Sequence, residues 1–261
     1  MVFFVSEFEK TEILGSKVSL MQPKRGYRVA IDPILLAASV PAKTGEKVLD
    51  VGSGTGASSL ALAARLPGIS CHGIEVQEKY ADISNENAKQ NKAQNRVHFF
   101  FGDIAAPPKN FKPDNYNHVM TNPPYLEYNH QRRSDIVEKR LATMESNVSL
   151  TDWIKFCVRS VKSKGTVTII HRADRLEKIL ESLNGKVGDL IIFPFWSTKK
   201  SSNENYSAKR VIIQGRKGVR APTQLKSGLV LHNDEGGFSE IADQILTKAR
   251  GLDLNGSRMI P

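Results

Sequence analysis

The stretch KVLDVGSGTGASSLALAARL, Lys47 to Leu66, decides the fold class. Its first five residues are mostly apolar and indicate a short buried strand. Three glycines, Gly52, Gly54 and Gly56, follow directly and lead into a segment with helical spacing. Glycine permits a tight turn and a close approach of the backbone to a ligand. The stretch therefore predicts a strand, a ligand-binding turn and a helix, the first unit of a parallel α/β sheet.

The same alternation of strand and helix continues along the chain. Further strands are predicted at 70–76, 96–104, 116–122 and 166–171, and helices at 77–92, 149–165 and 173–185. Two last strands, at 187–196 and 207–218, have no helix between them, so they should form an antiparallel hairpin. The prediction is one α/β domain with a seven-stranded, mostly parallel Rossmann-like sheet and helices on both faces.

Three parts of this domain are expected. Residues 1–45 form a lead-in whose helix, at 31–40, is expected to lie across the carboxyl edge of the sheet. Residues 46–220 form the ligand-binding core. Residues 221–261 form an extension of the same domain, with an amphipathic helix at 238–252 and a frayed end after it.

Three acids stand at the ends of the first three predicted strands: Asp50, Glu75 and Asp103. Asp50 precedes the glycines, where it would repel a pyrophosphate and favour a cationic ligand. S-adenosylmethionine carries a sulfonium and an ammonium group and no phosphate. Glu75 can accept from ribose hydroxyls and Asp103 from an adenine amine, although each acid could also simply cap the next turn or helix. The predicted cofactor-binding residues are Asp50, Gly52, Ser53, Gly54, Gly56, Glu75, Val76, Asp103, Ile104 and Asn122.

The fourth predicted strand ends in TNPPY, Thr121 to Tyr125. Proline cannot extend a strand, so the chain must turn there, at the edge where open α/β sheets bind ligands. The side-chain carbonyl of Asn122 and the backbone carbonyl of Pro123, fixed in angle by the prolines, can each accept one hydrogen of an exocyclic amine. Tyr125 offers a ring on which a base stacks. We therefore predict Asn122, Pro123, Pro124 and Tyr125 as the catalytic residues.

VLDVGSGTG, GIEV, GDI and TNPPY, in this order, resemble class I S-adenosylmethionine-dependent methyltransferases that act on amino nitrogens. The lead-in QPKRGYRVAIDPILLAAS and the segments RLATMES and SLTDWI are similar to the bacterial tRNA(1)(Val) adenine-N6-methyltransferase family. The resemblance covers roughly residues 14 to 220. It implies S-adenosylmethionine as cofactor and N6 of an adenine near the tRNA anticodon as the methyl acceptor.

The charge of the chain supports a nucleic-acid partner. The net charge is +10, and residues 199–226 hold eight basic residues against Glu204. Such a one-sided basic segment is typical of polyanion binding, although it can also serve solubility. The candidate RNA-binding residues are Lys199, Lys200, Arg216, Lys217, Arg132 and Arg133.

Other features are less specific. Arg28 and Asp32 could close over the cofactor or form a surface ion pair. The six histidines have no ligand spacing, so no metal is expected. No apolar run is long enough to span a membrane and no signal peptide is recognised, so a cytoplasmic protein with buried Cys71 and Cys157 is expected. Oligomeric state is not predicted.

Alternative functions remain open from the sequence. The same loop would serve adenine or guanine-N2 methylation in ribosomal RNA. Methylation of a protein glutamine fits less well, because only about 45 residues precede the first core strand. An NAD-dependent oxidoreductase or a catalytically silent RNA-binding relative are alternatives of another class.

Overall fold

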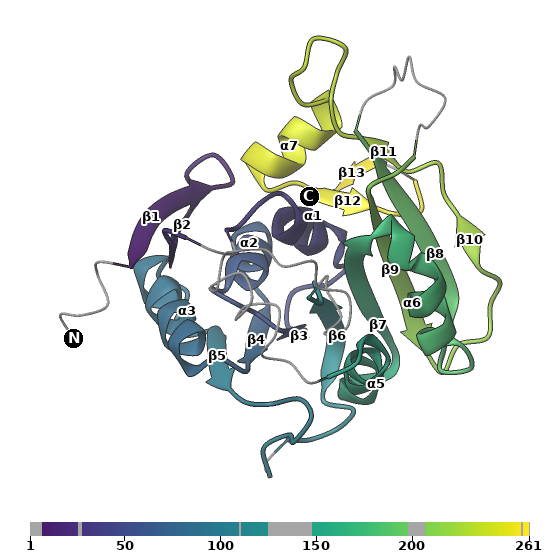
Figure 1. Cartoon of the computed structure of the whole chain (residues 1–261), viewed down its shortest axis with the longest axis horizontal. Coiled ribbons are helices and arrows are strands. Elements are labelled where there is room, and N and C mark those ends of the chain that lie inside the picture. Colours follow the sequence, from purple (N-terminus) through teal and green to yellow (C-terminus); the bar gives the residue numbers. More distant parts are fainter. Residues whose placement is uncertain are drawn as a thin grey trace, which may run out of the picture.

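The computed structural model is a layered α/β fold around one central sheet (Figure 1). It describes residues 7–25, 28–109, 111–124, 148–197, 207–256 and 258–260. The central sheet has the order β5-β4-β3-β6-β7-β9-β8, with short β10 and β11 beside β8. Its strands are β3 (Lys47–Val51), β4 (Ser70–Glu75), β5 (Val97–Phe101), β6 (Tyr116–Thr121), β7 (Val161–Arg172), β8 (Val187–Trp196), β9 (Arg210–Lys217), β10 (Gln224–Leu225) and β11 (Leu229–Val230).

The pairing confirms the predicted sheet. β5, β4, β3, β6 and β7 are parallel neighbours, whereas β9 is antiparallel to both β7 and β8. β10 and β11 were not predicted, because each is only two residues long and carries no alternating pattern of its own. They pair with β8 and so extend the sheet beyond seven strands.

Helices cover both faces of the sheet, as predicted. The helices that contribute to one core cluster are α1 (Asp32–Ser39), α2 (Ala57–Arg65), α3 (Glu78–Gln90) and α7 (Glu240–Lys248). The helices of the second cluster are α5 (Leu150–Ser160) and α6 (Leu176–Leu183), with the 3-10 turn η1 (Ala173–Arg175) before α6. Burial of these apolar faces is the main force that holds the layers together.

The boundary between α5 and β7 differs from the prediction of one helix to Gly165. α5 ends at Ser160, and β7 begins at Val161, which pairs with Tyr116. The backbone amides of Asp114 and Asn115 donate to the carbonyls of Arg159 and Ser160. Chain segments from the neighbouring strand therefore satisfy the last helical carbonyls, and strand pairing takes over where helical spacing alone predicted a longer helix.

The lead-in contains a hairpin that the sequence did not predict, β1 (Phe8–Ile13) and β2 (Val18–Pro23). Asn87 on α3 holds β2, because its Oδ1 accepts from the Met21 amide at 2.7 Å and its Nδ2 donates to the Met21 carbonyl at 3.1 Å. The same Nδ2 donates to the Thr55 carbonyl at 2.9 Å. One buried side chain thus ties the lead-in hairpin to the glycine turn.

Helix α1 does not lie across the carboxyl edge as expected. Asp32 at its start contacts Arg210, the first residue of β9, whereas the carbonyl of Ser39 at its end accepts from Gln214 in mid-strand. The helix therefore runs from that edge along one face of the sheet, and all eight of its residues are buried. An apolar helix gains more from burial on the sheet face than from an exposed edge.

The prediction of a frayed end was also wrong. After α7, β12 (Gly251–Asp253) pairs with β13 (Arg258–Ile260), and Leu252 and Leu254 are buried in the first core cluster. These two leucines anchor the end of the chain beside α1.

Candidate active site at the carboxyl edge

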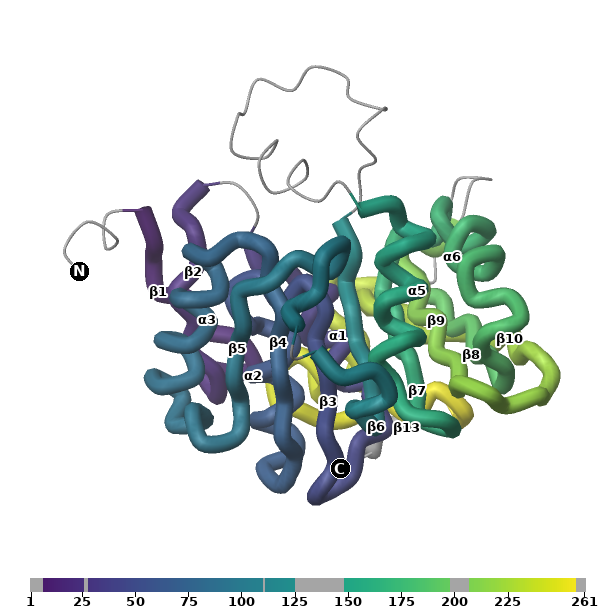
Figure 2. Tube along the Cα trace, turned by 90° about the horizontal axis from the view of Figure 1, so that it is seen from below, coloured from purple at the N-terminus to yellow at the C-terminus, as the bar shows by residue number. Residues whose placement is uncertain are grey.

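Four parallel strands bring the predicted site residues to one edge. β3, β4, β5 and β6 lie side by side and end at Val51, Glu75, Phe101 and Thr121 (Figure 2). The glycine turn, Val76, Asp103 and Asn122 follow these ends directly. The structure therefore gathers the described members of the predicted cofactor and catalytic sets at a single edge of the sheet.

The glycine turn folds back on the end of β4. The amides of Gly52 and Ser53 both donate to the carbonyl of Ile74, at 2.9 and 3.2 Å. Gly52 has a φ of 72°, and a Cβ on it would lie 2.6 Å from Cζ2 of Trp153. A side chain at this position would therefore be strained and would collide with the indole ring.

Glu75 holds the far side of the turn. Its carboxylate accepts from the Gly54 amide at 2.8 Å and from the Gln77 amide at 3.0 Å. Each carboxylate oxygen can accept more than one hydrogen bond, so a carboxylate in these contacts can also accept from a ligand hydroxyl. Glu75 is therefore placed to link the turn to a bound ribose.

Asp50 is buried, and its Oδ2 accepts from the Ser59 hydroxyl at 2.8 Å. Burial raises the pKa of the Asp50 carboxyl to about 7, and the negative charge of Glu75 acts in the same direction, against the lowering effect of the Ser59 hydrogen bond. The sequence analysis placed Asp50 where its charge would favour a cationic ligand, whereas the contact that the structure shows for its carboxylate is with Ser59 on α2.

Asp50→Asn should make the protein less sensitive to pH. Between the ordinary pKa of 3.8 and about 7, the folded state keeps a proton that the unfolded state has lost. The stability of the native protein therefore falls as pH rises through this window, by about 1.4 kcal/mol per unit at most. The asparagine cannot ionise. The unfolding temperature of the variant relative to that of the native protein should therefore rise as pH increases to about 7 and stay constant above it.

Asp103→Asn is the matched control, since Asp103 is an exposed acid at the same edge. Its unfolding temperature should follow that of the native protein across the same pH range. A native profile unchanged by Asp50→Asn would mean that the Asp50 carboxyl does not titrate in this window.

Asn122 follows the last residue of β6. Its Oδ1 is buried and has no hydrogen-bond partner among the described residues. Pro123 beside it is buried. A buried acceptor without a partner is rare in a folded protein and calls for a ligand or a functional explanation. The loop therefore holds, at the sheet edge, a buried acceptor that no described residue satisfies.

Trp153 on α5 connects this loop to the glycine turn, a link that sequence reasoning missed. Its Nε1 donates to Oγ1 of Thr121 at 2.8 Å, and the Thr121 hydroxyl donates to the carbonyl of Val51 at 2.8 Å. The ring also lies against Gly52. The sequence signal was a single tryptophan on the buried face of an amphipathic helix, which indicates core packing but not its partners.

The third strand end agrees with the capping alternative. Asp103 is exposed, and its Oδ1 accepts from the Ala105 amide at 2.8 Å. Ile104 packs against the second core cluster, and Val76 is half-buried. An adenine amine could still reach Asp103, because the turn occupies one carboxylate oxygen only.

Arg28 and Asp32 do not pair with each other. Arg28 contacts Glu9 of the lead-in hairpin at 2.5 Å, and Asp32 accepts from Arg210 at 2.7 Å. The first pair is largely exposed and of small energetic value, whereas the buried Asp32 fastens the start of α1 to β9.

Two of the predicted RNA-binding residues, Arg216 and Lys217, lie away from the site. β9 runs antiparallel to β7, so Arg216 lies opposite Thr166 at the amino edge, with Lys217 next to it. These two residues and the carboxyl edge are separated by the length of β9. Tyr125, Arg132, Arg133, Lys199 and Lys200 lie outside the described residues.

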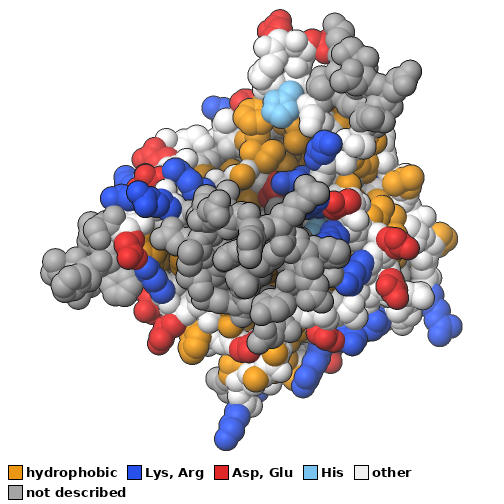
Figure 3. All heavy atoms as spheres, viewed as in Figure 1, with side chains coloured by type: hydrophobic (Ala, Val, Ile, Leu, Met, Phe, Trp, Pro, Cys, Tyr) orange, Lys and Arg blue, Asp and Glu red, His pale blue; other side chains and the backbone are white. Residues whose placement is uncertain are grey.

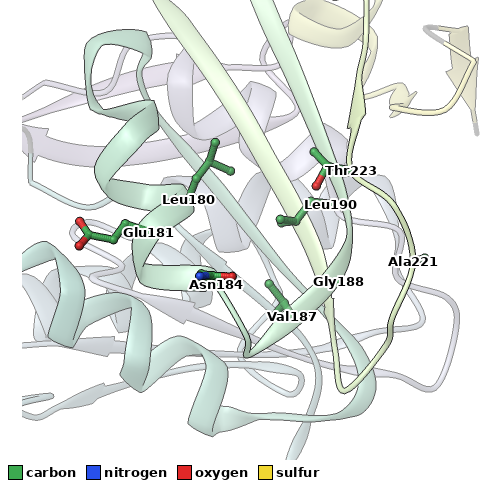
Figure 4. Close-up of a pocket in the computed structure, with 8 residues that line it drawn as sticks. All are labelled: Leu180, Glu181, Asn184, Val187, Gly188, Leu190, Ala221 and Thr223. Carbon is green, nitrogen blue, oxygen red and sulfur yellow. The ribbon is translucent and has the colours of Figure 1, made fainter.

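A hollow of about 410 Å³ lies elsewhere, between α6, β8 and the segment before β10 (Figure 4). Leu180, Val187 and Leu190 line it together with Asn184 and Thr223. It is remote from the glycine turn, because Val187 pairs with Lys217 at the amino edge. Within the described ranges, no group of three potential metal ligands occurs and no helix is long and apolar enough to cross a membrane.

Comparison with known proteins agrees with this geometry. The methyltransferase small domain family matches residues 29–152. A tRNA1(Val) (adenine(37)-N6)-methyltransferase of Shewanella sp. (strain MR-4) is 24% identical over 216 residues, 82% of this chain and 88% of the relative. A protein of the same name from Proteus mirabilis is 36% identical over 101 residues, 38% of this chain and 40% of the relative.

Solved structures share the fold. A predicted O-methyltransferase from Agrobacterium tumefaciens superposes with a TM-score of 0.67 at 22% identity, covering 82% of this chain and 94% of that one. An O-methyltransferase from Thermotoga maritima gives 0.53 at 17% identity, covering 76% and 69%. With these similarities and the glycine turn at the edge of this sheet, we conclude that the chain is an S-adenosylmethionine-dependent methyltransferase, and that its residues 29–152 are similar to the methyltransferase small domain family.

Proposed function

We propose that this enzyme methylates N6 of an adenine in tRNA, near the anticodon. The observation that carries the proposal is the buried Oδ1 of Asn122, which has no partner among the described residues and stands at the carboxyl edge. An exocyclic amine is a donor that such an acceptor can bind. The names of the relatives, tRNA1(Val) (adenine(37)-N6)-methyltransferases, support tRNA and adenine as the substrate class.

The chain's own residues fit the cofactor. Ser53 Oγ at the glycine turn is buried and has no hydrogen-bond partner in the described part of the chain. A Cβ on Gly54 would meet no described atom within 4 Å, so the backbone there can be approached closely, and the Glu75 carboxylate lies beside it. These residues, with Asp103 at the adenine end, would hold S-adenosylmethionine, which supplies a methyl group on a positively charged sulfur.

The residues of the loop would prepare the methyl acceptor. The adenine amine is a poor nucleophile, because its lone pair is delocalised into the ring. Asn122 Oδ1 and the Pro123 carbonyl would each accept one amine hydrogen and localise that lone pair on nitrogen. Holding the amine in line with the methyl group would increase the rate of transfer, because correct orientation of the reacting groups accounts for much of such catalysis. Tyr125, predicted from sequence, would stack on the base.

The target adenine must leave its stack to reach the edge. A base that takes part in chemistry is splayed out of a loop or flipped from a helix. An anticodon loop presents unpaired bases, which lowers the energy needed to extrude one. This requirement favours a loop adenine over one in a duplex.

Transfer of labelled methyl groups tests the proposal. The purified protein and labelled S-adenosylmethionine are incubated with total tRNA and with ribosomal RNA from a strain that lacks the protein, and the labelled nucleosides are mapped. N6-methyladenosine in one tRNA, close to its anticodon, is the expected product. Label in guanine N2, in ribosomal RNA or in protein would contradict the proposed substrate and leave the methyltransferase activity standing.

A further inference from the structure

Positive charge gathers at the amino edge of the sheet, opposite the candidate active site. Six basic residues there form what we call the amino-edge patch: Lys47, Lys162, Lys164, Lys186, Arg216 and Lys217. They stand at or next to the first residues of β3, β7 and β8 and at the last residues of β9. The sequence analysis grouped two of them, Arg216 and Lys217, with Lys199 and Lys200, which precede β9 in the chain.

Contacts in the structure join these residues into one surface. Asn117 Oδ1 accepts from the Lys47 amide at 3.1 Å and from Lys162 Nζ at 3.5 Å. Arg216 Nε donates to the Lys164 carbonyl at 3.2 Å. The Gly218 amide donates to the Lys186 carbonyl at 3.5 Å. These contacts place the six residues next to one another along the amino edge, from β3 across β6, β7 and β9 to β8.

Acidic neighbours cancel only part of this charge. Asp189 lies 3.7 Å from Arg216, and Asp114 accepts from Lys217 at 2.7 Å. A third acid, Glu46, contacts His118 at 2.9 Å. Within the described ranges, no carboxylate lies at ion-pair distance from Lys47, Lys164 or Lys186. The patch keeps an excess of positive charge on one edge, which is the electrostatic footprint of a polyanion binder.

The patch and the active site face in opposite directions. β9 joins the two edges with eight residues, Arg210–Lys217, which corresponds to roughly 25 Å at about 3.3 Å per residue. The carboxyl edge, seen in Figure 3, carries Lys and Arg side chains interspersed with Asp and Glu around its centre. A single straight RNA helix cannot lie on both edges, whereas a folded RNA with two arms can reach both.

We propose that the amino-edge patch binds the phosphate backbone of a second segment of a folded RNA substrate, apart from the loop that carries the target base. This inference rests on the proposed function, because it takes RNA as the substrate. Lysine and arginine at a sheet edge suit phosphate groups without reading sequence. An acidic membrane fits less well, because stable anchoring by a basic patch needs an apolar or lipid anchor beside it. The large hydrophobic side chains that the described residues leave exposed lie on β5, on β10 and beside α7.

The test compares two charge-reversal variants on two RNAs. Lys47→Glu, Lys164→Glu and Lys186→Glu together reverse three of the four patch charges that have no carboxylate at ion-pair distance among the described residues. Lys89→Glu, Lys155→Glu and Lys248→Glu change the net charge equally at exposed positions elsewhere. Affinity is measured over a salt series with total tRNA and with a short stem-loop that contains the target adenine, and methyl transfer is measured on the stem-loop.

The patch variant should bind tRNA at least tenfold more weakly than the control variant at moderate salt. Its slope of log affinity against log salt should fall by about 2.7, or about 0.9 for each lost phosphate contact. Stem-loop methylation and affinity for S-adenosylmethionine should match the control. Equal tRNA affinity of the two variants, or an equal loss on tRNA and stem-loop, would overturn the inference.

Two further outcomes separate the possible failures. Loss of binding to phosphatidylserine vesicles with unchanged tRNA affinity would assign the patch to a membrane and overturn the RNA proposal. Patch-dependent tRNA binding by a protein that methylates neither tRNA nor the stem-loop would refute the proposed function and leave the RNA-binding surface standing.

Discussion

Asn122→Ala is expected to lower methyl transfer by about 10²- to 10³-fold, the range for loss of one positioned hydrogen-bonding group in a reacting site. The affinity for S-adenosylmethionine should stay within about threefold, because the glycine turn and Glu75 are untouched. The fold should tolerate the change, since Oδ1 of Asn122 has no partner among the described residues whose loss would destabilise it. Single-turnover rates and calorimetric titration of the cofactor measure the two quantities separately.

Asn122→Asp is the matched variant, because it keeps an oxygen acceptor at the same position. It should recover part of the rate lost in the alanine variant, although its charge changes the electrostatics of the loop. Asn85→Ala is a control outside the loop, since Asn85 holds the backbone of Phe99 at 2.8 and 3.1 Å. If Asn122→Ala retained the native rate, the acceptor role would be wrong, and the loop would serve as a rigid turn only.

The sheet could be predicted from sequence because its units are local. The residue pattern that predicts a strand and the helix after it lies within about twenty consecutive residues. The glycines of the turn mark where the first strand ends. The parallel order then places Glu75 and Asn122 at the same edge without any further information. The frame of the candidate site therefore follows from short-range patterns and from the geometry of parallel strands.

Features that depend on contacts between residues far apart in the sequence could not be predicted. Asn87 on α3 holds β2. A polar side chain in a predicted helix indicates an exposed position, and only the structure shows that the hairpin lies against this one. Residues 199–226 look like one basic segment, yet β9 carries Arg216 to the opposite edge from Arg210. Charged residues that are close in the sequence end up on opposite edges when a strand between them crosses the sheet. Composition alone therefore cannot locate a binding surface.

Trp153→Ala should destabilise the protein and weaken both halves of the site together. Removal of a buried tryptophan ring costs about 3–5 kcal/mol, because it leaves a cavity. Here the ring also supports Gly52, and its N–H holds Thr121, the neighbour of Asn122. Thermal unfolding measures the loss of stability, and steady-state kinetics well below the unfolding temperature should show a higher KM for S-adenosylmethionine and a lower kcat.

Trp153→Phe separates packing from hydrogen bonding, because it keeps a ring against Gly52 and removes the donor to Thr121. We expect a folded enzyme with a near-native KM for the cofactor and a kcat about tenfold lower, since only the Asn122 side of the link is released. Trp196→Phe is the control, because Trp196 donates a comparable 2.9 Å hydrogen bond to the Ser227 carbonyl at the far side of the sheet. It also leaves Trp153 as the one fluorophore of its type, so its emission reports on cofactor binding at the turn. A Trp153→Phe enzyme with a native kcat and only a lower unfolding temperature would mean that Trp153 is a packing residue. It would also mean that its hydrogen bond to Thr121 does not couple the glycine turn to the catalytic loop.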